Sequence, residues 1–288
     1  MQNRLQSTAV RLAKQLYYRT PLRSLRGLYF RVFASIVRGR TVIASVDGTN
    51  FELDLSELID LCVYLNQWEK EVTDLIEKNT HPGMTVLDIG ANIGAHALRF
   101  GRIVGSGGKV FAFEPTDFGY RKLVRNLSLN AFPQVVPIQV ALADENQCRR
   151  TIHFRSSWRT DGRRVVAPTT VDFERLDDLA TRRSVGHVDI IKIDVDGNEF
   201  PILLGGRELI QRCRPLFLME AVSPHFEREE TNPFSFLAGL GYRFWDSKTG
   251  LEHGGSRAIQ DLLPKHDAGM TVSINLVASH TVPAFVLS

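Results

Sequence analysis

One segment of the sequence combines the residue types that bind a small ligand at the edge of a sheet. Residues 86–94, VLDIGANIG, read as a buried strand, a glycine turn and the start of a helix. Asp88 lies in the strand, and Gly90 and Gly94 have no Cβ, so the backbone can approach a ligand closely. A second acid, Glu114, ends the next apolar run 24 residues after Gly90. There it can accept hydrogen bonds from both hydroxyls of a ribose, beyond the carboxyl ends of the strands where doubly wound sheets bind ligands.

The glycine spacing favours a nucleoside ligand that has no pyrophosphate. The segment has the pattern G-x-x-x-G, and the G-x-G-x-x-G pattern of dinucleotide sites is absent from the sequence. A carboxylate just before the turn, Asp88, suits a ligand with a cationic end. S-adenosylmethionine carries an ammonium and a sulfonium group and no phosphate. Two alternatives stay open: a nicotinamide-dependent oxidoreductase on a similar sheet, and a nucleoside-binding scaffold without catalysis.

Four carboxylates are candidates for the chemistry of a reaction. Asp194 and Asp196 end an apolar run and, two residues apart, point to the same side of a strand. Glu199 lies in the first helical turn beyond them, and Glu220 closes the next apolar run. Such acids can remove the proton of a hydroxyl group or bind a divalent metal ion, whose ligands the sequence leaves unknown. Alternatively, Glu199 only complements a helix N-terminus and one aspartate only caps the turn.

The elements that must position these acids alternate between short apolar runs and helical segments. This alternation predicts an α/β fold, with a mostly parallel sheet covered by helices on both faces. The predicted strands are 85–89, 109–113, 135–142, 188–195 and 216–219, with an additional β excursion at 151–154 and 165–171 and edge strands at 242–245 and 271–277. The predicted helices are 56–79, 94–104, 117–130, 199–211 and 233–239.

The N-terminal part has a different charge from the rest of the chain. Residues 1–40 contain nine Lys and Arg and no acid, which leaves the remainder at −6 within an overall +3. Such a body is not of the nucleic-acid-binding type. We expect a basic amphipathic segment over 1–40, a hairpin and helix extension over 41–83, and the main domain over 84–288. The apolar residues of one predicted helical face in the first segment are Leu22, Leu25, Tyr29, Val32, Phe33 and Ile36.

This basic segment suits the surface of an anionic membrane, although its apolar face could equally pack on the main domain. A transit peptide is a weaker alternative. The three cysteines, Cys62, Cys148 and Cys213, are far apart and odd in number, so a disulfide framework is not expected and a reducing compartment fits. We therefore expect a cytoplasmic protein, with peripheral contact at the inner membrane face through residues 1–40.

Over about residues 41–280 the sequence resembles the FkbM-type S-adenosylmethionine-dependent methyltransferases. The resemblance implies a class I methyltransferase fold and methyl transfer from S-adenosylmethionine to a hydroxyl on a sugar, glycolipid or polyketide-like acceptor. The segments that carry it are VLDIGANIGAHAL (86–98), VFAFEP (110–115), VALADE (140–145), LDDLA (176–180), DIIKIDVDGNEFPILLGG (189–206) and PLFLMEA (215–221).

The resemblance also assigns roles to individual residues. The cofactor loop falls on Asp88, Gly90, Ala91, Asn92 and Gly94, the ribose-binding acid on Glu114, and an adenine-side position on Asp144. Two positions depart from the family pattern. Asp196 stands where the family usually has glutamate, and Ala95 or His96 stands where an aromatic residue is frequent.

Overall fold

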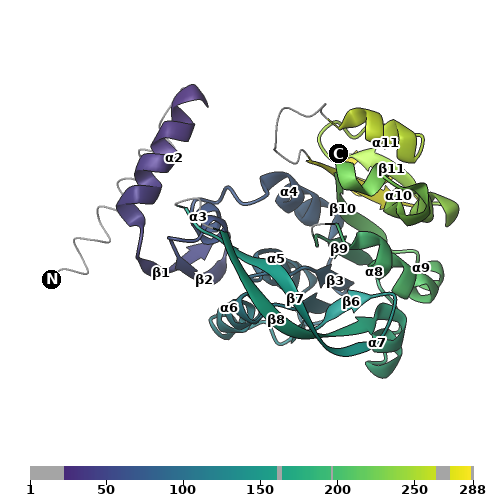
Figure 1. Ribbon diagram of the computed structural model, residues 1–288, viewed down its shortest axis with the longest axis horizontal. Coiled ribbons are helices and arrows are strands. Elements are labelled where there is room, and N and C mark those ends of the chain that lie inside the picture. The colour runs from purple at the N-terminus through teal and green to yellow at the C-terminus, as the bar shows by residue number, and fades with distance from the viewer. Residues whose placement is uncertain (1–22, 161–163, 196, 264–272, 287–288) are drawn as a thin grey trace. The chain divides into compact units, whose positions relative to one another are not determined.

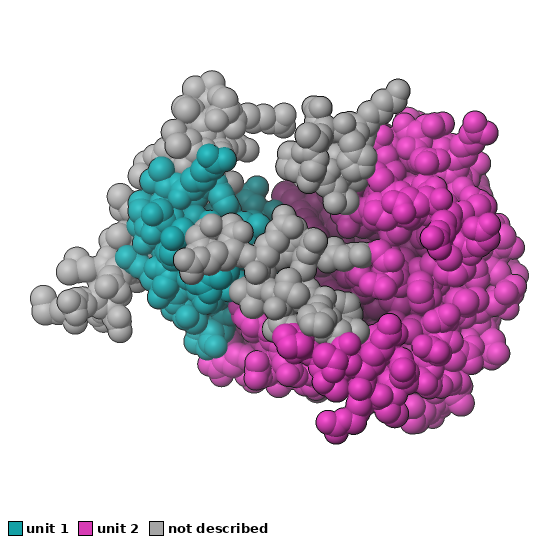
Figure 2. Space-filling view, in the orientation of Figure 1, with its two compact units in different colours: residues 1–68, 153–167 teal, residues 69–152, 168–288 magenta. Residues whose placement is uncertain are grey.

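A computed structural model of the protein describes residues 23–160, 164–195, 197–263 and 273–286. The chain divides into two compact units, shown in Figure 2. Unit 1 comprises residues 1–68 and 153–167, and unit 2 comprises residues 69–152 and 168–288. The division expected from the sequence, with boundaries at residues 40 and 83, stays a prediction.

The elements follow one another along the chain as labelled in Figure 1. The helices are α2 (Arg23–Val37), α3 (Leu58–Tyr64), α4 (Lys70–Asn79), α5 (Ala95–Val104), α6 (Asp117–Ser128), α7 (Leu176–Arg182), α8 (Glu199–Gly205), α9 (Arg207–Cys213), α10 (Pro233–Gly239) and α11 (Ser256–Leu262), with 3-10 turns η1 (Ser223–Phe226), η2 (Glu229–Thr231) and η3 (Ala284–Val286). The strands are β1 (Thr41–Val46), β2 (Thr49–Asp54), β3 (Thr85–Ile89), β4 (Lys109–Phe113), β5 (Val135–Ile138), β6 (Ala141–Ala143), β7 (Gln147–Trp158), β8 (Arg164–Arg175), β9 (Ile190–Ile193), β10 (Leu216–Val222), β11 (Arg243–Asp246), β12 (Glu252–His253) and β13 (Ser273–Ser279).

Unit 2 is built on a mixed sheet with the order β12-β11-β13-β10-β9-β3-β4-β5. The strands from β10 to β5 are parallel to their neighbours, whereas β13, β11 and β12 pair antiparallel. Strands β3, β4 and β9 are almost entirely buried, which explains why they read as continuous apolar runs. The predicted α/β fold is therefore confirmed. Strands β11 and β13 form where edge strands were expected, but both lie inside the sheet, whose edge on that side is β12.

The strand order reverses between β3 and β9. From β3 the chain proceeds to β4 and β5 on one side, and it later returns to β9 and β10 on the other side. In open α/β sheets, ligands bind outside the carboxyl ends of the strands at such a reversal. The segments that follow β3 and β9 are the two segments singled out in the sequence.

Three predicted elements are each divided in the structure. The helix expected over 56–79 is interrupted between α3 and α4, where Asn66 and Glu69 have φ values of +49° and +36°. The helix expected over 199–211 separates into α8 and α9 at Gly206, and the strand expected over 135–142 separates into β5 and β6. Strand β5 is the sheet edge and contains Pro137, a residue that edge strands tolerate, whereas β6 pairs with β8 in a second sheet. Strand patterns alone do not reveal such a change of sheet.

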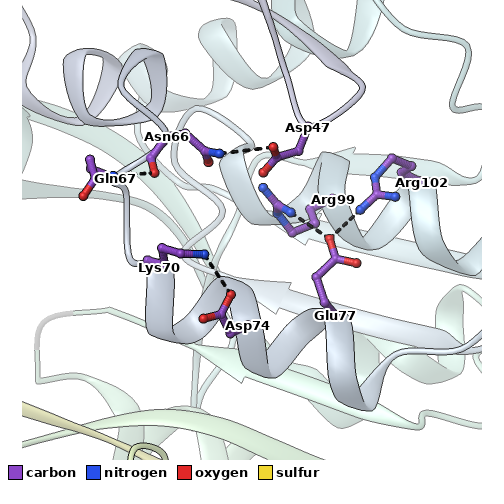
Figure 3. Close-up of polar contacts among 8 residues, drawn as sticks. All are labelled: Asp47, Asn66, Gln67, Lys70, Asp74, Glu77, Arg99 and Arg102. Carbon is purple, nitrogen blue, oxygen red and sulfur yellow. Dashed lines mark hydrogen bonds and ion pairs between the residues drawn. The ribbon is translucent and has the colours of Figure 1, made fainter. Parts of the chain in front are cut away.

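Unit 1 contains the predicted hairpin of β1 and β2, which pair antiparallel around Asp47 and Gly48. Both turn residues have positive φ, as the favoured two-residue hairpin turn requires. Asp47 accepts a hydrogen bond of 3.1 Å from the side chain of Asn66, which follows α3 (Figure 3). The Phe33 ring of α2 stacks on the Tyr64 ring of α3 at 6.5 Å between centroids. These contacts hold α2, α3 and the hairpin of this unit together.

Candidate active site

The loop after β3 turns sharply and lies against the end of β9. Its residues Gly90, Asn92 and Gly94 have φ values of +83°, +49° and +88°. The backbone N–H groups of Gly90 and Ala91 both donate to the carbonyl of Phe113, at 3.0 and 2.9 Å. A Cβ on Gly90 would lie 2.0 Å from the carbonyl oxygen of Asp194, so the close approach of the two segments requires glycine here. The predicted cofactor loop and the predicted catalytic segment are thus adjacent.

The Glu114 carboxylate, which follows β4, joins the same loop. One oxygen accepts from the backbone N–H of Asn92 at 2.9 Å, and the other accepts from the backbone N–H of Thr116 at 2.9 Å and from its hydroxyl at 2.5 Å. Burial raises the pKa of Glu114, although these hydrogen bonds oppose the shift. A Cβ on Gly119 would lie 2.7 Å from the Glu114 carboxyl carbon, so α6 packs directly on this side chain. The oxygen that accepts from Asn92 can still accept one further hydrogen bond, whereas the oxygen bound to Thr116 already accepts two.

A buried lysine, Lys192, lies between the carboxylates of Asp88 and Asp194. Lys192, on β9, donates to Asp194 at 3.1 Å and lies 3.7 Å from Asp88. Burial alone would lower the pKa of Lys192, but the two carboxylates outweigh it and raise that pKa, so the lysine stays protonated. Asp88 is fully buried, burial raises its pKa, and neither of its oxygens has a hydrogen-bond partner among the described residues. Asp194 differs, because its side chain is 31% exposed and therefore accessible.

Helix α4 brings a further acid to this cluster. Glu69, at its N-terminus, contacts Nε2 of His96 on α5 at 2.7 Å. Burial raises the pKa of Glu69, but the hydrogen bond and charge of His96 outweigh this and hold it below its usual range. Farther along α4, Glu77 contacts Arg99 at 2.7 Å and also Arg102 (Figure 3). These contacts connect α4 to α5.

A small pocket of about 20 Å³, enough for roughly one water molecule, opens beside Lys192. Its polar lining comprises Glu69, Lys192, Asp194 and Glu220, with Asn275 of the neighbouring strand β13. Two of the predicted catalytic acids, Asp194 and Glu220, therefore line one pocket at the carboxyl ends of β9 and β10. Glu69 is an additional acid of this pocket, and the sequence alone did not predict its place beside Asp194 and Glu220.

Glu199 lies in a separate contact with His225. The Glu199 carboxylate is 2.6 Å from Nε2 of His225, and the two side chains are only 3% and 4% exposed. The backbone N–H of Val222 donates to Nδ1 of His225 at 3.3 Å, which leaves Nε2 as the protonated nitrogen that donates to Glu199. Burial raises the pKa of Glu199, but His225 outweighs it and lowers that pKa. The other Glu199 oxygen accepts from the N–H groups of Val195 and Gly197, so this pair holds the turn after β9.

The remaining predicted site residues are placed as follows. Asp144 is exposed beyond β6, a strand of the second sheet. Asp196 lies outside the described residues. Among the residues that are described, no three His, Cys, Asp or Glu side chains form a metal-binding group. The direct roles expected for Asp194, Asp196, Glu199 and Glu220, and the cofactor contacts expected for Asp88, Glu114 and Asp144, stay predictions.

Two curated proteins show sequence similarity to this chain. The 2-O-methyltransferase NoeI of Sinorhizobium fredii is 26% identical over 51% of this chain and 66% of its own length. The hexuronic acid methyltransferase AglP of Haloferax volcanii is 28% identical over 50% of this chain and 58% of its own length. The chain therefore spans less than two thirds of the length of these relatives. Among solved structures, the methyltransferase FkbM of Methylobacillus flagellatus aligns at 15% identity over 88% of this chain and 59% of that chain, with a TM-score of 0.39, which is too distant to support a conclusion.

Comparison of the sequence with models of protein families identifies the family of this chain. The methyltransferase FkbM domain matches residues 88–244, more than half of the chain. The match begins at Asp88 and includes the glycine loop, Glu114, the Asp194–Glu199 segment, Glu220 and His225. It confirms the family expected from the sequence and decides against the oxidoreductase alternative. The chain belongs to the FkbM methyltransferase family, whose members use S-adenosylmethionine as methyl donor.

Proposed function

We propose that this protein transfers a methyl group from S-adenosylmethionine to a hydroxyl group of a small sugar-like acceptor. The observation that carries the proposal is the joint placement of Asp88, Glu114 and Asp194 at the carboxyl ends of β3, β4 and β9. Family membership supports methyl transfer, and the names of both relatives support oxygen-rich acceptors, a 2-O position in one and a hexuronic acid in the other.

The residues at the strand ends fit this cofactor in charge and in hydrogen-bonding capacity. Glu114 keeps acceptor capacity for one ribose hydroxyl while Asn92 and Thr116 hold it in place. Asp88 supplies buried negative charge without hydrogen-bond partners in the described structure, beneath the loop that would face the cationic end. When bound, S-adenosylmethionine supplies an already activated, electrophilic methyl group, so positioning accounts for much of the rate.

In this proposal the protein's own contribution to the chemistry is proton removal at Asp194. A hydroxyl oxygen becomes a good nucleophile only as its proton leaves, and a base that takes it contributes about 10²–10⁴-fold in rate. Asp194 is accessible, and it accepts a 3.1 Å hydrogen bond from Lys192, which holds its carboxylate in place. Glu220 lines the same pocket and orients the acceptor. Glu199 acts on position only, by accepting from the N–H groups of Val195 and Gly197 just after Asp194.

Asp194→Asn should lower the rate of methyl transfer at least about 10²-fold and leave S-adenosylmethionine affinity nearly unchanged. The amide keeps the shape of the side chain and loses the ability to accept a proton. The measurement is transfer of a labelled methyl group to a panel of hexoses, hexuronic acids and lipid-linked sugars, together with calorimetric titration of the cofactor. Asp261→Asn, an exposed acid on α11, is the matched control and should behave as the wild type. Wild-type turnover by Asp194→Asn would remove Asp194 from the reaction, and a wild type without cofactor binding would overturn the proposed function itself.

We also propose that α2 of unit 1 contacts an anionic membrane surface. The apolar face predicted for this segment is divided in the structure: α2 buries Phe33, Ala34 and Val37, whereas Val32 and Ile36 are 50% and 49% exposed. No helix in the described parts of the chain is long and apolar enough to cross a membrane. The exposed pair is accompanied by Arg31 and Arg38, and no acid occurs before Asp47, a combination that suits the headgroup region.

The full chain should float with vesicles containing phosphatidylglycerol at low salt, because each basic residue near such a surface contributes about 1 kcal/mol. High salt should reduce the bound fraction, and so should the double variant Val32→Ser/Ile36→Ser. Leu251→Ser, which changes a 62% exposed leucine of unit 2, is the control and should float like the wild type. Equal flotation of the double variant and this control would exclude α2 as the contact.

A further inference from the structure

The carboxyl ends of β9 and β10 lie side by side, and each strand brings one acid to the candidate active site. Met219 of β10 pairs with Ile193 of β9 in parallel register, so Glu220 and Asp194 are the next residues along the two strands. Both acids line the small pocket. Their relative position decides where an acceptor hydroxyl can lie with respect to the base, so the segments that follow the two strands matter for the reaction.

A buried pair of side chains joins these two following segments. Nε2 of His225, in η1, donates to one oxygen of the Glu199 carboxylate at 2.6 Å. The other Glu199 oxygen accepts from the N–H groups of Val195 and Gly197 at 3.4 and 3.3 Å. On the far side of the imidazole, Nδ1 accepts from the N–H of Val222, the last residue of β10. A continuous path of hydrogen bonds therefore runs from the end of β10 to the turn that follows β9.

The imidazole end of this path is fixed by the hydrophobic core. The His225 ring packs on Phe234 at 5.8 Å between centroids, and the neighbouring Phe226 ring stacks on Phe234 at 5.5 Å. Phe234, in the first turn of α10, is fully buried and packs edge-on against Phe244 of β11. The turn at the other end has little packing of its own, since no atom of the described residues would lie within 4 Å of a Cβ on Gly197. The turn therefore depends on the carboxylate, and the carboxylate on the imidazole.

We propose that His225 is a positioning residue of the methyl-transfer reaction, which acts through Glu199 to fix the turn after β9 and thereby the place of Asp194 beside Glu220. The inference rests on the proposed function, in which Asp194 removes the proton of the acceptor. The His225 and Glu199 side chains are only 4% and 3% exposed, so they act on position and do not exchange a proton with the acceptor. A reacting group displaced by about 1 Å can lose about 10²-fold in rate, so a distant contact of this kind affects the reaction.

Two substitutions of His225 separate the two contacts of its ring. The side-chain amide of His225→Gln can donate to Glu199 as Nε2 does, whereas the shorter amide of His225→Asn reaches only the position of Nδ1. With S-adenosylmethionine and the best sugar acceptor both saturating, kcat should fall at least about tenfold in His225→Asn and about threefold or less in His225→Gln. KM for S-adenosylmethionine should stay at the wild-type value in both variants. Glu227→Gln, which changes an exposed acid just after η1, is the control and should behave as the wild type.

Backbone amide signals of the full ¹⁵N-labelled chain provide a readout that needs no turnover. The signals of Val195 and Gly197 should move in His225→Asn and stay near their wild-type positions in His225→Gln. Equal losses of kcat in both variants, accompanied by a lower unfolding temperature, would show that the imidazole serves only the fold and would overturn the positioning role. An active wild type with an equally active His225→Asn variant would overturn this role alone, whereas a wild type without methyl transfer would overturn the proposed function and this role together.

Discussion

Gly90→Ala is expected to lower the free energy of unfolding by more than ~4 kcal/mol, an unusually large effect for one added methyl group. The new Cβ would lie 2.0 Å from the carbonyl oxygen of Asp194, a backbone atom that cannot rotate away. The φ of +83° adds roughly 1–2 kcal/mol of strain for any residue with a Cβ. To relieve the contact, the loop after β3 must move away from the end of β9. That movement displaces Asp194, so methyl transfer should fall together with stability.

Gly83→Ala is the matched control for this substitution. Gly83 has a φ of +87°, close to that of Gly90, but nothing lies within 4 Å of the position that its added methyl group would take. Gly83→Ala should therefore lower the free energy of unfolding only by the backbone strain, roughly 1–2 kcal/mol. Urea unfolding of both variants measures the difference, which isolates the contact between the two segments. Similar losses in the two variants would mean that the loop after β3 relaxes freely, and that it does not hold Asp194.

Lys192→Met is expected to lower the free energy of unfolding by about 3 kcal/mol, the lower end of the range for breaking a buried ion pair. The substitution leaves Asp88 buried beside an apolar side chain and removes the 3.1 Å hydrogen bond to Asp194. Because Asp194 is 31% exposed, water replaces part of that bond. Activity should fall as well, since Asp194 loses the hydrogen bond that holds its carboxylate in place.

Two further variants make the lysine result specific. Lys109→Met changes an exposed lysine at the start of β4 and should stay within ~0.5 kcal/mol of the wild type. Adding Asp88→Asn to Lys192→Met removes the buried charge and should recover at least about 1 kcal/mol. Unfolding in urea at pH 7 measures all three proteins. A loss below ~1 kcal/mol for Lys192→Met would show that Asp88 takes up a proton and needs no partner.

The sequence predicted the sheet of unit 2 well because its strands are buried on both faces. Runs such as 85–89 and 109–113 are apolar for a physical reason that does not depend on distant residues, and both strands appear with these bounds. The turn at Asp47 and Gly48 was predicted for a similar reason, because these two residues alone indicate a hairpin turn. The division of 135–142 into β5 and β6 depends on β8, a partner more than 20 residues farther along the chain, so no local pattern predicts it.

The site was predictable in position and less so in its contacts. Asp88, Glu114 and Asp194 lie at the ends of predicted parallel strands, and the carboxyl ends of parallel strands share one edge of a sheet. The pairing of Glu199 with His225 joins residues 26 positions apart, and only the contact between α8 and η1 reveals it. The contact of Glu69 with His96 was not predicted for the same reason, since it depends on how α4 meets α5.

The central position of β9 has a consequence for synthesis of the protein on the ribosome. Strand β3 pairs with β9 only after the intervening chain has been made, and the contact between Thr85 and Asp189 joins residues 104 positions apart. At ~5–20 residues per second, roughly 5–20 s pass between the emergence of these two strands. During that interval the apolar strand β3 has an open edge, the kind of surface that chaperones protect and that promotes aggregation. The strand order that brings the carboxyl ends of β3 and β9 together therefore delays the assembly of the candidate site until the second half of translation.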